Sequence, residues 1–496
     1  LQKKVTIITE FNVTVHFEGS SQSNYQISDL KYFKQIYSGF VNFDDIYPLY
    51  EVKYSAYDYL IISHPDFLSA ANTLASHRSN DMSVNVVSTD TTGSTPTEII
   101  NFIQNEYTQN GISYVLIMGD HEYVPAKSSL VYTDLYYAAV DGSDYFPDLS
   151  IGRIPVDTLS EANNIVNKII RYETTSPVNP DFSEDYAIAA YFQDYDVNGY
   201  ADRRFAQTSE EIRNFLVSQE YNAERIYYAG SNVNPTNWND GVFSNGEPIP
   251  DELLKPGFAW DGNKEDIINA VDRGVTILNH RDHGGVTGWS EPSFQISDLP
   301  NLQNVDLPIV FSINCLTGKF TQDECFAEEF LLLDDKGAVG VIAASDVSYS
   351  GYNDYLTRGF YDAIWPDFDT NFTNDEPELH LGSVLNYGKE YMKGTWGGGG
   401  STQQREYELF HYFGDPTMQI RVQSGKGKIP MNSGTPFYTT NQNPVYPQNL
   451  SCLMNMQDGD TCNQTWTVNA TGSSETWEFY TIYDSLPYSC LLYTSD

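Results

Sequence analysis

Two reactive side chains follow apolar runs near the middle of the chain. The first run, Val-Thr-Ile-Leu-Asn-His-Arg-Asp, spans 275–282 and precedes His283 and two glycines. The second, Pro-Ile-Val-Phe-Ser-Ile-Asn, spans 308–314 and precedes Cys315. Short apolar runs of this kind predict buried strands. A thiol, an imidazole and the accessible backbone N–H groups of glycine are components of a cysteine hydrolase.

Cys315 could also be an inert thiol of the core, since cysteine is often buried. The residues that follow it, Leu316-Thr317-Gly318, are typical of a turn and place the thiol at the rim of the sheet. A thiol at the rim, near an imidazole, can ionise and attack a carbonyl carbon. Cys325 is expected to begin the next helix and to pack in the core.

Two histidines compete for the role of base. His280 lies within the strand and is expected to form hydrogen bonds in the core. His283 is the better candidate, because Gly284 and Gly285 let the backbone approach a ligand closely. The His-x-x-His spacing could instead hold a metal in a metal-dependent hydrolase, but the helical context that places two such rings on one face is missing.

Apolar strands alternate with amphipathic helices from residue 57 to residue 393. This pattern predicts a mostly parallel sheet covered by helices on both faces. Asp120, His283, Cys315 and Ser345 each follow an apolar run, so we expect them to gather at the carboxyl ends of the strands. The predicted strands are 59–63, 84–87, 114–118, 186–191, 225–228 and 338–344, with the two runs above; the predicted helices are 70–77, 97–107, 160–173, 203–219, 264–272, 327–334, 353–364 and 376–393.

Changes in composition divide the chain into three parts. Residues 1–55 predict a small β segment, 56–423 an α/β catalytic domain, and 424–496 a small β-sandwich that stops without a clear final strand. Cys452 and Cys462 could close a hairpin disulfide in an oxidising compartment. Leu1 has no signal-peptide pattern after it, which predicts a mature or truncated start.

The chain has 496 residues, with 27 Lys and Arg against 67 Asp and Glu, and a formal charge of −40. Such a surface repels nucleic acid and anionic membranes, and it attracts cationic peptides and divalent cations. It could equally be a solubility adaptation of an exported protein. No apolar run has the length of a membrane span, so a soluble protein is predicted. The 37 Tyr with few Lys, and the many Asn, Ser and Thr, favour a secreted protein.

Asp194, Asp196 and Asn198, with Gly199 after them, match the first half of a calcium-binding loop. The bidentate Glu expected at the twelfth position is missing, because that position is Phe205. Loops of this composition are often simple turns, so both interpretations stay open.

Several motifs, in this order, resemble the gingipain family of cysteine peptidases, which belongs with the caspases, legumain and clostripain. The similarity extends over about 57–422. It rests on Met118-Gly-Asp-His121, Val124-Pro-Ala-Lys127, Asp144-Tyr145, Ile151-Gly-Arg153, Asn279 to Gly284, Asn314-Cys315 with Gly318, Cys325-Phe-Ala-Glu328, Ala343-Ala-Ser345 and Phe413-Gly-Asp-Pro416.

The resemblance implies a caspase-like catalytic domain that hydrolyses peptide bonds through a thioester. Cys315 would be the nucleophile and His283 the general base and acid, while the N–H groups of Cys315 and Gly284 would form the oxyanion hole. No cofactor is needed for this chemistry. The acidic residue that orients the histidine in the family would fall near Gln193 or Asp194, and a Gln could only form a hydrogen bond there.

The resemblance also implies cleavage after Arg or Lys. Asp202 is the acidic residue nearest the specificity position, and the loop 345–352 would wall the pocket through Ser345, Tyr349 and Tyr352. Family members bind structural calcium and carry an immunoglobulin-like domain, which would match residues 424–496. Many are secreted with an inhibitory prosegment, and residues 1–55 would be either its remainder or a separate β segment. The alternative is a catalytically inactive surface or binding protein on the same scaffold.

Overall fold

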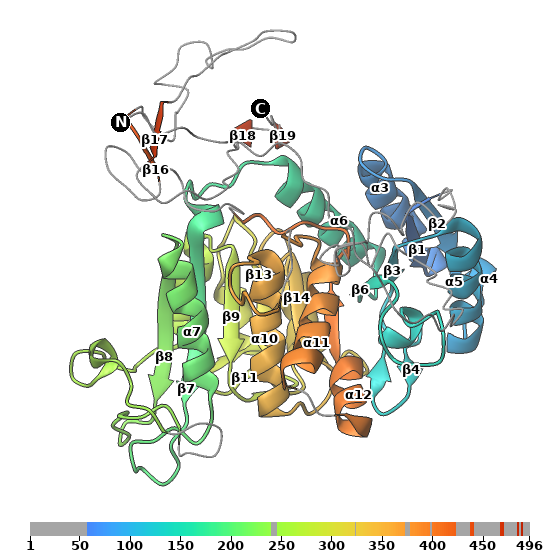
Figure 1. Ribbon diagram of the computed structural model, residues 1–496. Coiled ribbons are helices and arrows are strands. Elements are labelled where there is room, and N and C mark those ends of the chain that lie inside the picture. Colours follow the sequence, from blue (N-terminus) through green and yellow to red (C-terminus); the bar gives the residue numbers. More distant parts are fainter. Residues whose placement is uncertain are drawn as a thin grey trace, which may run out of the picture.

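The computed structural model contains one large sheet with helices on both faces (Figure 1). The structure describes residues 57–239, 246–322, 324–372, 377–396 and 399–422, with the short segments 437–440, 467–470, 484–485 and 488–489. The predicted leading β segment 1–55 and the predicted disulfide between Cys452 and Cys462 lie outside the described residues. Of the predicted β-sandwich, the description covers only two short antiparallel pairs, β16 (Phe437–Thr439) with β17 (Val468–Ala470) and β18 (Asp484–Ser485) with β19 (Tyr488–Ser489).

The sheet has ten strands in the order β2-β1-β3-β6-β15-β14-β13-β9-β7-β8. Most of these strands are buried on both faces and therefore read as continuous apolar runs rather than as alternating patterns. Their bounds are β1 (Tyr59–Ser63), β2 (Val84–Ser88), β3 (Tyr114–Met118), β6 (Ser150–Ile154), β7 (Asp185–Phe192), β8 (Asn222–Ala229), β9 (Ile277–Arg281), β13 (Ile309–Ile313), β14 (Gly340–Ala344) and β15 (Phe410–Phe413).

Helices cover both faces of this sheet. One face carries α7 (Phe205–Ser218), α10 (Ser350–Ile364) and α11 (Leu381–Trp396), which lie in front of the strands in Figure 1. The other face carries α3 (Leu68–Arg78), α6 (Leu159–Thr174), α8 (Lys264–Arg273) and α9 (Phe326–Leu332). Helix α4 (Thr89–Thr92) contacts β2, α5 (Pro96–Asn110) contacts α4, and α12 (Gly400–Leu409) contacts β15. The predicted α/β class is confirmed.

Several helices begin where the sequence supplies a capping side chain. The hydroxyl of Thr95 accepts the N–H of Glu98, whose carboxylate accepts the N–H of Thr95 in return, and Pro96 occupies the first helical position of α5. Thr158 and Glu161 form the same reciprocal pair at α6. Such pairs satisfy N–H groups that have no partner inside the helix.

The sheet consists of two parallel blocks that run in opposite directions. Strand β15 pairs antiparallel with β14 and parallel with β6, so β2, β1, β3 and β6 run opposite to the block from β14 to β8. Asp120 follows β3, whereas His283, Cys315 and Ser345 follow strands of the other block. The prediction that Asp120 shares an edge with these three residues is therefore wrong, because the carboxyl ends of the two blocks lie at opposite edges. Strands β6 and β15 of this sheet and helices α4 and α12 were not predicted.

A buried ion pair lies near the junction of the two blocks. The Arg153 guanidinium on β6 donates from Nε and Nη2 to the two carboxylate oxygens of Asp134, both at 2.7 Å. Its Nη1 donates to the carbonyl oxygens of Gly119 and Val124. Burial works against ionisation of Asp134, but Arg153 holds the pKa of that carboxyl below its usual range.

The substitution Asp134→Asn should lower the free energy of unfolding by about 3–5 kcal/mol, because it leaves a buried guanidinium without its counter-charge. Urea unfolding measures this effect. The matched control is Asp335→Asn, whose partner Arg171 lies 3.7 Å away at the surface; it should cost less than about 1 kcal/mol. Equal effects of the two substitutions would contradict the stabilising role of the buried Arg153–Asp134 pair.

Candidate active site

The site is formed where two neighbouring parallel strands leave the sheet. Strand β9 pairs with β13 in a register that places Arg281 opposite Ile313. His283 and Cys315 each follow two residues after these partners, so both emerge at the same edge. Both side chains are partly exposed.

Gly284 lies directly against the end of β13. A Cβ at this position would overlap the amide of Asn314 and lie 2.8 Å from the carbonyl oxygen of Cys315. Gly284 faces Trp289 across the hairpin of β10 (Gly284–Gly285) and β11 (Gly288–Trp289). The adjacent Ser290 N–H donates to the carbonyl oxygen of His283. Because hydrogen-bonded and non-hydrogen-bonded pairs alternate in an antiparallel hairpin, the N–H of Gly284 points out of the hairpin.

Cys315 is held at a strained turn. Leu316, the next residue, has a φ of 63°, which is unfavourable for a side chain with a Cβ. The Sγ atom lies 3.6 Å from the carbonyl oxygen and 3.8 Å from the hydroxyl of Ser348. The Ser348 hydroxyl also donates to the carbonyl oxygen of Asn314. Cys325, by contrast, is fully buried at the start of α9, as predicted.

His283 is held by an amide and an aromatic ring. Its Nε2 lies 2.7 Å from Oε1 of Gln193, which follows β7. The Phe205 ring contacts the imidazole edge-on, with ring centroids 5.2 Å apart, and the Arg281 guanidinium lies over the Phe205 ring, 4.4 Å from its centroid. Burial, followed by the charges of Arg281 and Arg203, lowers the pKa of His283 below its ordinary value. A neutral imidazole at neutral pH is the consequence.

His280 belongs to the core. Its ring stacks on Trp289 with centroids 4.2 Å apart. Its Nδ1 accepts from the Asn314 amide at 2.9 Å, and Nε2 lies 3.2 Å from the carbonyl oxygen of Glu291. Burial lowers the pKa of His280 to about 3. Both nitrogens are therefore occupied, which leaves neither for a metal shared with His283.

The loop after β7 contains both candidates for the third residue. Both carboxylate oxygens of Asp194 accept backbone N–H groups of their own loop, from Asn198 at 3.1 Å and from Gly199 at 2.8 Å. Gln193, not Asp194, contacts His283. Asp202 lies beside Gln193, and its Oδ2 accepts the Tyr195 N–H at 2.9 Å.

The loop 345–352 contacts the residues that follow β13, through Asp346 and Ser348. Ser345 is buried, and its hydroxyl donates to the carbonyl oxygen of Tyr132. Tyr349 is 47% exposed, and its N–H donates to the buried carboxylate of Glu406. Tyr352 packs against Trp396. Tyr349 is thus the most exposed member of this set, whereas Ser345 is buried beneath the surface.

A model of peptidase family C25 matches residues 53–421. The chain belongs to peptidase family C25. Lys-gingipain W83 of Porphyromonas gingivalis is 24% identical over 375 residues, which cover 72% of this chain and 20% of that protein. Gingipain R2 of the same organism is 26% identical over 262 residues, which cover 51% of this chain and 31% of that protein. The chain thus spans less than a third of the length of these two relatives.

The crystal structure of the Arg-specific cysteine proteinase gingipain R has the same fold, with a TM-score of 0.61 at 19% identity over 79% of this chain and 85% of that chain. These findings confirm the predicted family and its class, the cysteine-type hydrolases. None of the helices in the described part of the chain combines the length and the hydropathy of a membrane span.

Two contacts of the C25 site were not predicted residue by residue. Ser348 falls inside the predicted loop, but its sequence gives no sign that it would meet the thiol. Phe205 interrupts the match to a calcium motif and packs against His283 in the structure. Ser348 and Phe205 are both ordinary loop or helix residues by sequence, so no local signal could have selected them.

The loop of Asp194, Asp196 and Asn198 fits a turn better than a calcium site. Asp194 binds two N–H groups, as described above. The Asn198 carbonyl oxygen Oδ1 accepts the Tyr200 N–H at 2.7 Å, and its amide donates to Asp196 at 3.0 Å. The oxygens that would surround a cation are therefore directed toward donors within the loop.

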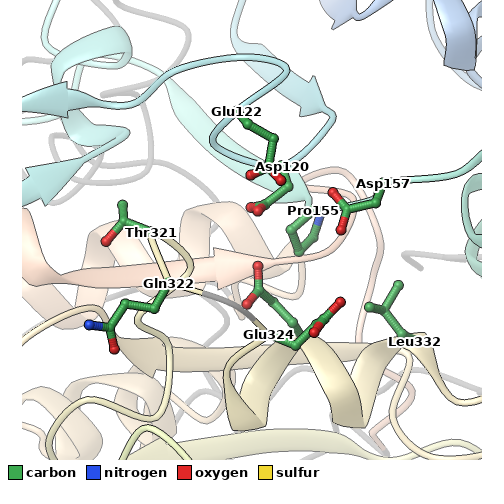
Figure 2. A pocket seen from close by; sticks show the side chains of 9 residues that line it. Asp120, Glu122, Pro155, Asp157, Thr321, Gln322, Glu324 and Leu332 are labelled. Atoms are coloured by element: carbon green, nitrogen blue, oxygen red, sulfur yellow. The ribbon is translucent and has the colours of Figure 1, made fainter.

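A second acidic cluster is a better fit for a divalent cation. Figure 2 shows the carboxylates of Asp120, Glu122 and Asp157 turned toward one another in a cavity of about 210 Å³, which Glu324 and Glu328 also line. One oxygen from each of the first three lies within 4.8 Å of the others. Two oxygens bound to one Ca²⁺ at about 2.4 Å can be separated by up to about 4.8 Å.

The electrostatics of this acidic cluster also favour a cation. Asp120 is 8% exposed, and within the described residues no donor reaches its buried Oδ1. Burial, and then the charge of Glu328, raises the pKa of Asp120, and burial raises the pKa of Asp157 to about 6. Carboxylates in such a site must either hold protons or share a cation.

Of the two central cysteines, we expect only Cys315 to react with iodoacetamide in the native protein. Cys325 is fully buried, and burial raises the pKa of its thiol well above the ordinary value. Peptide mass spectrometry after brief labelling measures the modification. Both should react in denaturant, which serves as the control; equal labelling of both in the native protein would contradict the geometry.

Proposed function

We propose that the chain is a secreted cysteine endopeptidase that uses Cys315 and His283 to cleave after Arg or Lys. The observation that carries this proposal is the packing of Gly284 against the end of β13. A Cβ on Gly284 would lie 2.8 Å from the carbonyl oxygen of Cys315, and His283 is the residue directly before this glycine. This packing supports a role for the Gly284 N–H in the oxyanion hole. The low content of Lys and the strongly acidic surface support an extracellular location.

The chemistry follows from these positions. The imidazole nitrogen that does not contact Gln193 takes the proton of the Cys315 thiol, and the sulfur attacks the peptide carbonyl. The N–H groups of Gly284 and Cys315 stabilise the negative charge on the oxygen. The His283 imidazolium then gives its proton to the leaving amine. Water, activated by the same imidazole, hydrolyses the thioester and restores the thiol.

A preference for a basic residue before the cleaved bond rests on Asp202. Its Oδ2 is bound to the loop, but among the described residues its Oδ1 has no hydrogen-bond partner. A carboxylate oxygen at the edge of the site can pair with an ammonium or guanidinium group. The names of the similar proteins, Lys-gingipain and an Arg-specific proteinase, support the same substrate class. The net charge of −40 would concentrate cationic peptides near the surface.

Fluorogenic peptides that differ only in an Arg, Lys, Asn or Asp before the cleaved bond test this function. Arg or Lys peptides should be cleaved fastest. Cys315→Ala should abolish cleavage, and His283→Ala should lower kcat/KM by at least about a thousandfold. Asp202→Asn should lower kcat/KM at least about tenfold for the basic peptides relative to the neutral one.

The matched control for this experiment is Cys325→Ala, which should keep the wild-type profile. An absence of cleavage for every peptide, combined with no labelling by an Arg-based acyloxymethyl ketone, would favour a binding protein on the peptidase scaffold. Cleavage that survives Cys315→Ala but not a chelator would indicate a metal-dependent hydrolase.

We further propose that a structural calcium ion is held by Asp120, Glu122 and Asp157 rather than by the loop of Asp194, Asp196 and Asn198. Glu328 would add a fourth carboxylate from α9. The ion would join the ends of β3 and β6 to α9 and remove the repulsion among the carboxylates. It would supply stability and take no part in peptide hydrolysis.

Calcium should raise the Tm by at least about 2 °C over the same protein in EDTA, because it binds only the folded state. Without calcium, the raised pKa values destabilise the fold as the pH rises, since the carboxyls must then lose protons; the calcium effect should therefore be larger at about pH 8.5 than at about pH 6. Asp120→Asn should remove the effect, and Asp196→Asn, at the other loop, should leave it intact. The opposite pattern would assign the ion to the loop.

A further inference from the structure

We propose that Asp202 is a positioning residue: it fixes the orientation of the Gln193 amide and, through it, the tautomer of His283. The inference rests on the proposed Cys315–His283 dyad and adds a role to Asp202 beyond contact with substrate. Gln193 Nε2 lies 3.4 Å from Asp202 Oδ2, and Gln193 Oε1 lies 2.7 Å from His283 Nε2.

The two ends of an amide group are chemically different, whereas their shapes are nearly the same. A carboxylate oxygen only accepts hydrogen bonds, so Asp202 selects the NH₂ end of Gln193. The carbonyl end then faces His283. Asp202 is itself fixed, because its Oδ2 accepts the Tyr195 N–H at 2.9 Å and its own N–H donates to the carbonyl oxygen of Gln193 at 2.8 Å.

The orientation of the amide determines which imidazole nitrogen carries the hydrogen. Oε1 of Gln193 accepts, so Nε2 of His283 must donate and Nδ1 is left as the base. If the amide turned over, its NH₂ group would donate to Nε2, and the hydrogen would move to Nδ1. That tautomer cannot accept the proton of the thiol.

This dependence follows from the presence of an amide at position 193. A carboxylate there could only accept from Nε2 and would select the tautomer without help. Gln193 is 3% exposed, so water cannot readily take the place of Asp202. The charged side chains that act on His283 are Arg281 and Arg203, both cations. Among the described residues, no anion contacts the ring and favours one nitrogen over the other.

The test measures the rate of Cys315 alkylation by iodoacetamide as a function of pH, which needs no peptide substrate. Asp202→Ala should slow alkylation at neutral pH by at least about tenfold, because the amide loses its fixed orientation. Asp202→Asn should stay within about threefold of wild type, since its carbonyl oxygen can still accept from Tyr195 and Gln193. Gln193→Glu combined with Asp202→Ala should restore the rate, because a carboxylate needs no orienting partner.

These variants separate the positioning role from the proposed contact with a basic substrate residue. Loss of a substrate charge contact would affect Asp202→Asn as strongly as Asp202→Ala, and only in peptide cleavage. An absence of peptidase activity in the wild type and in all variants would overturn the proposed function. The alkylation rates would still test the role of Asp202, because they need no peptide substrate. A wild-type alkylation rate for Asp202→Ala, or no recovery of that rate in the double variant, would overturn the proposal that Asp202 orients the Gln193 amide.

A direct measurement on the wild-type protein covers the case in which Asp202→Ala fails to fold. The ¹⁵N chemical shifts of the His283 imidazole distinguish the two tautomers. The hydrogen is expected on Nε2 at a pH above the pKa of the ring. A hydrogen on Nδ1 would contradict the proposal.

Discussion

The parallel pairing of β9 with β13 is the constraint on which the site depends. Its register brings two residues that are 32 positions apart in the chain to the same edge of the sheet. The close approach then requires glycine at 284, because any side chain there would overlap Asn314. Asn314 in turn bonds His280 and Ser312, so the turn that presents Cys315 is fixed from the core side. The reactive groups are thus placed by backbone pairing and need no flexible loop to bring them together.

Three arginines of this acidic chain form ion pairs inside the fold. Arg153 pairs with Asp134, Arg281 with Asp354, and Arg78 with Asp415 and Glu173. The pairs of Arg281 and Arg78 join elements that are far apart in sequence, and all three cations are buried. The outer surface therefore keeps most of the negative charge, which is the sign that would attract a cationic peptide. The placement of Lys and Arg thus affects both the stability of the interior and the charge of the surface.

The environment of His283 differs from a thiolate–imidazolium pair. Arg281 and Arg203 disfavour a positive charge on the ring, and the group that contacts Nε2 is an amide. In the proposed dyad with Cys315, a neutral imidazole would fit a mechanism in which proton transfer accompanies attack on the carbonyl. The orientation of that amide then matters more than the charge of any single residue, because a general base must have its free nitrogen on the side of the thiol.

The amino-acid sequence determined most of the local structure. The predicted strands between β1 and β14 were recognised as continuous apolar runs, since a strand buried on both faces has no polar side. Thr95 and Thr158 mark the starts of two helices, because their side chains cap the first turn. The turn after Cys315 and the glycines after His283 also distinguished these residues from Cys325 and His280.

Only the tertiary structure decided the direction of the two sheet blocks, the contact of Gln193 with His283, the contact of Ser348 with Cys315, and the meeting of Asp120 with Asp157. The four-residue strand β15 pairs antiparallel with β14 and parallel with β6, and these two pairings set the relative direction of the blocks. The sequence of β15 alone does not predict either pairing. Gln193 and Asp194 are adjacent in sequence and equally polar, yet one reaches the imidazole and the other closes its own turn. Contacts of this kind depend on strand register and loop path, which are set by packing between distant segments, whereas a sequence pattern reports only the periodicity and the capping of each segment by itself.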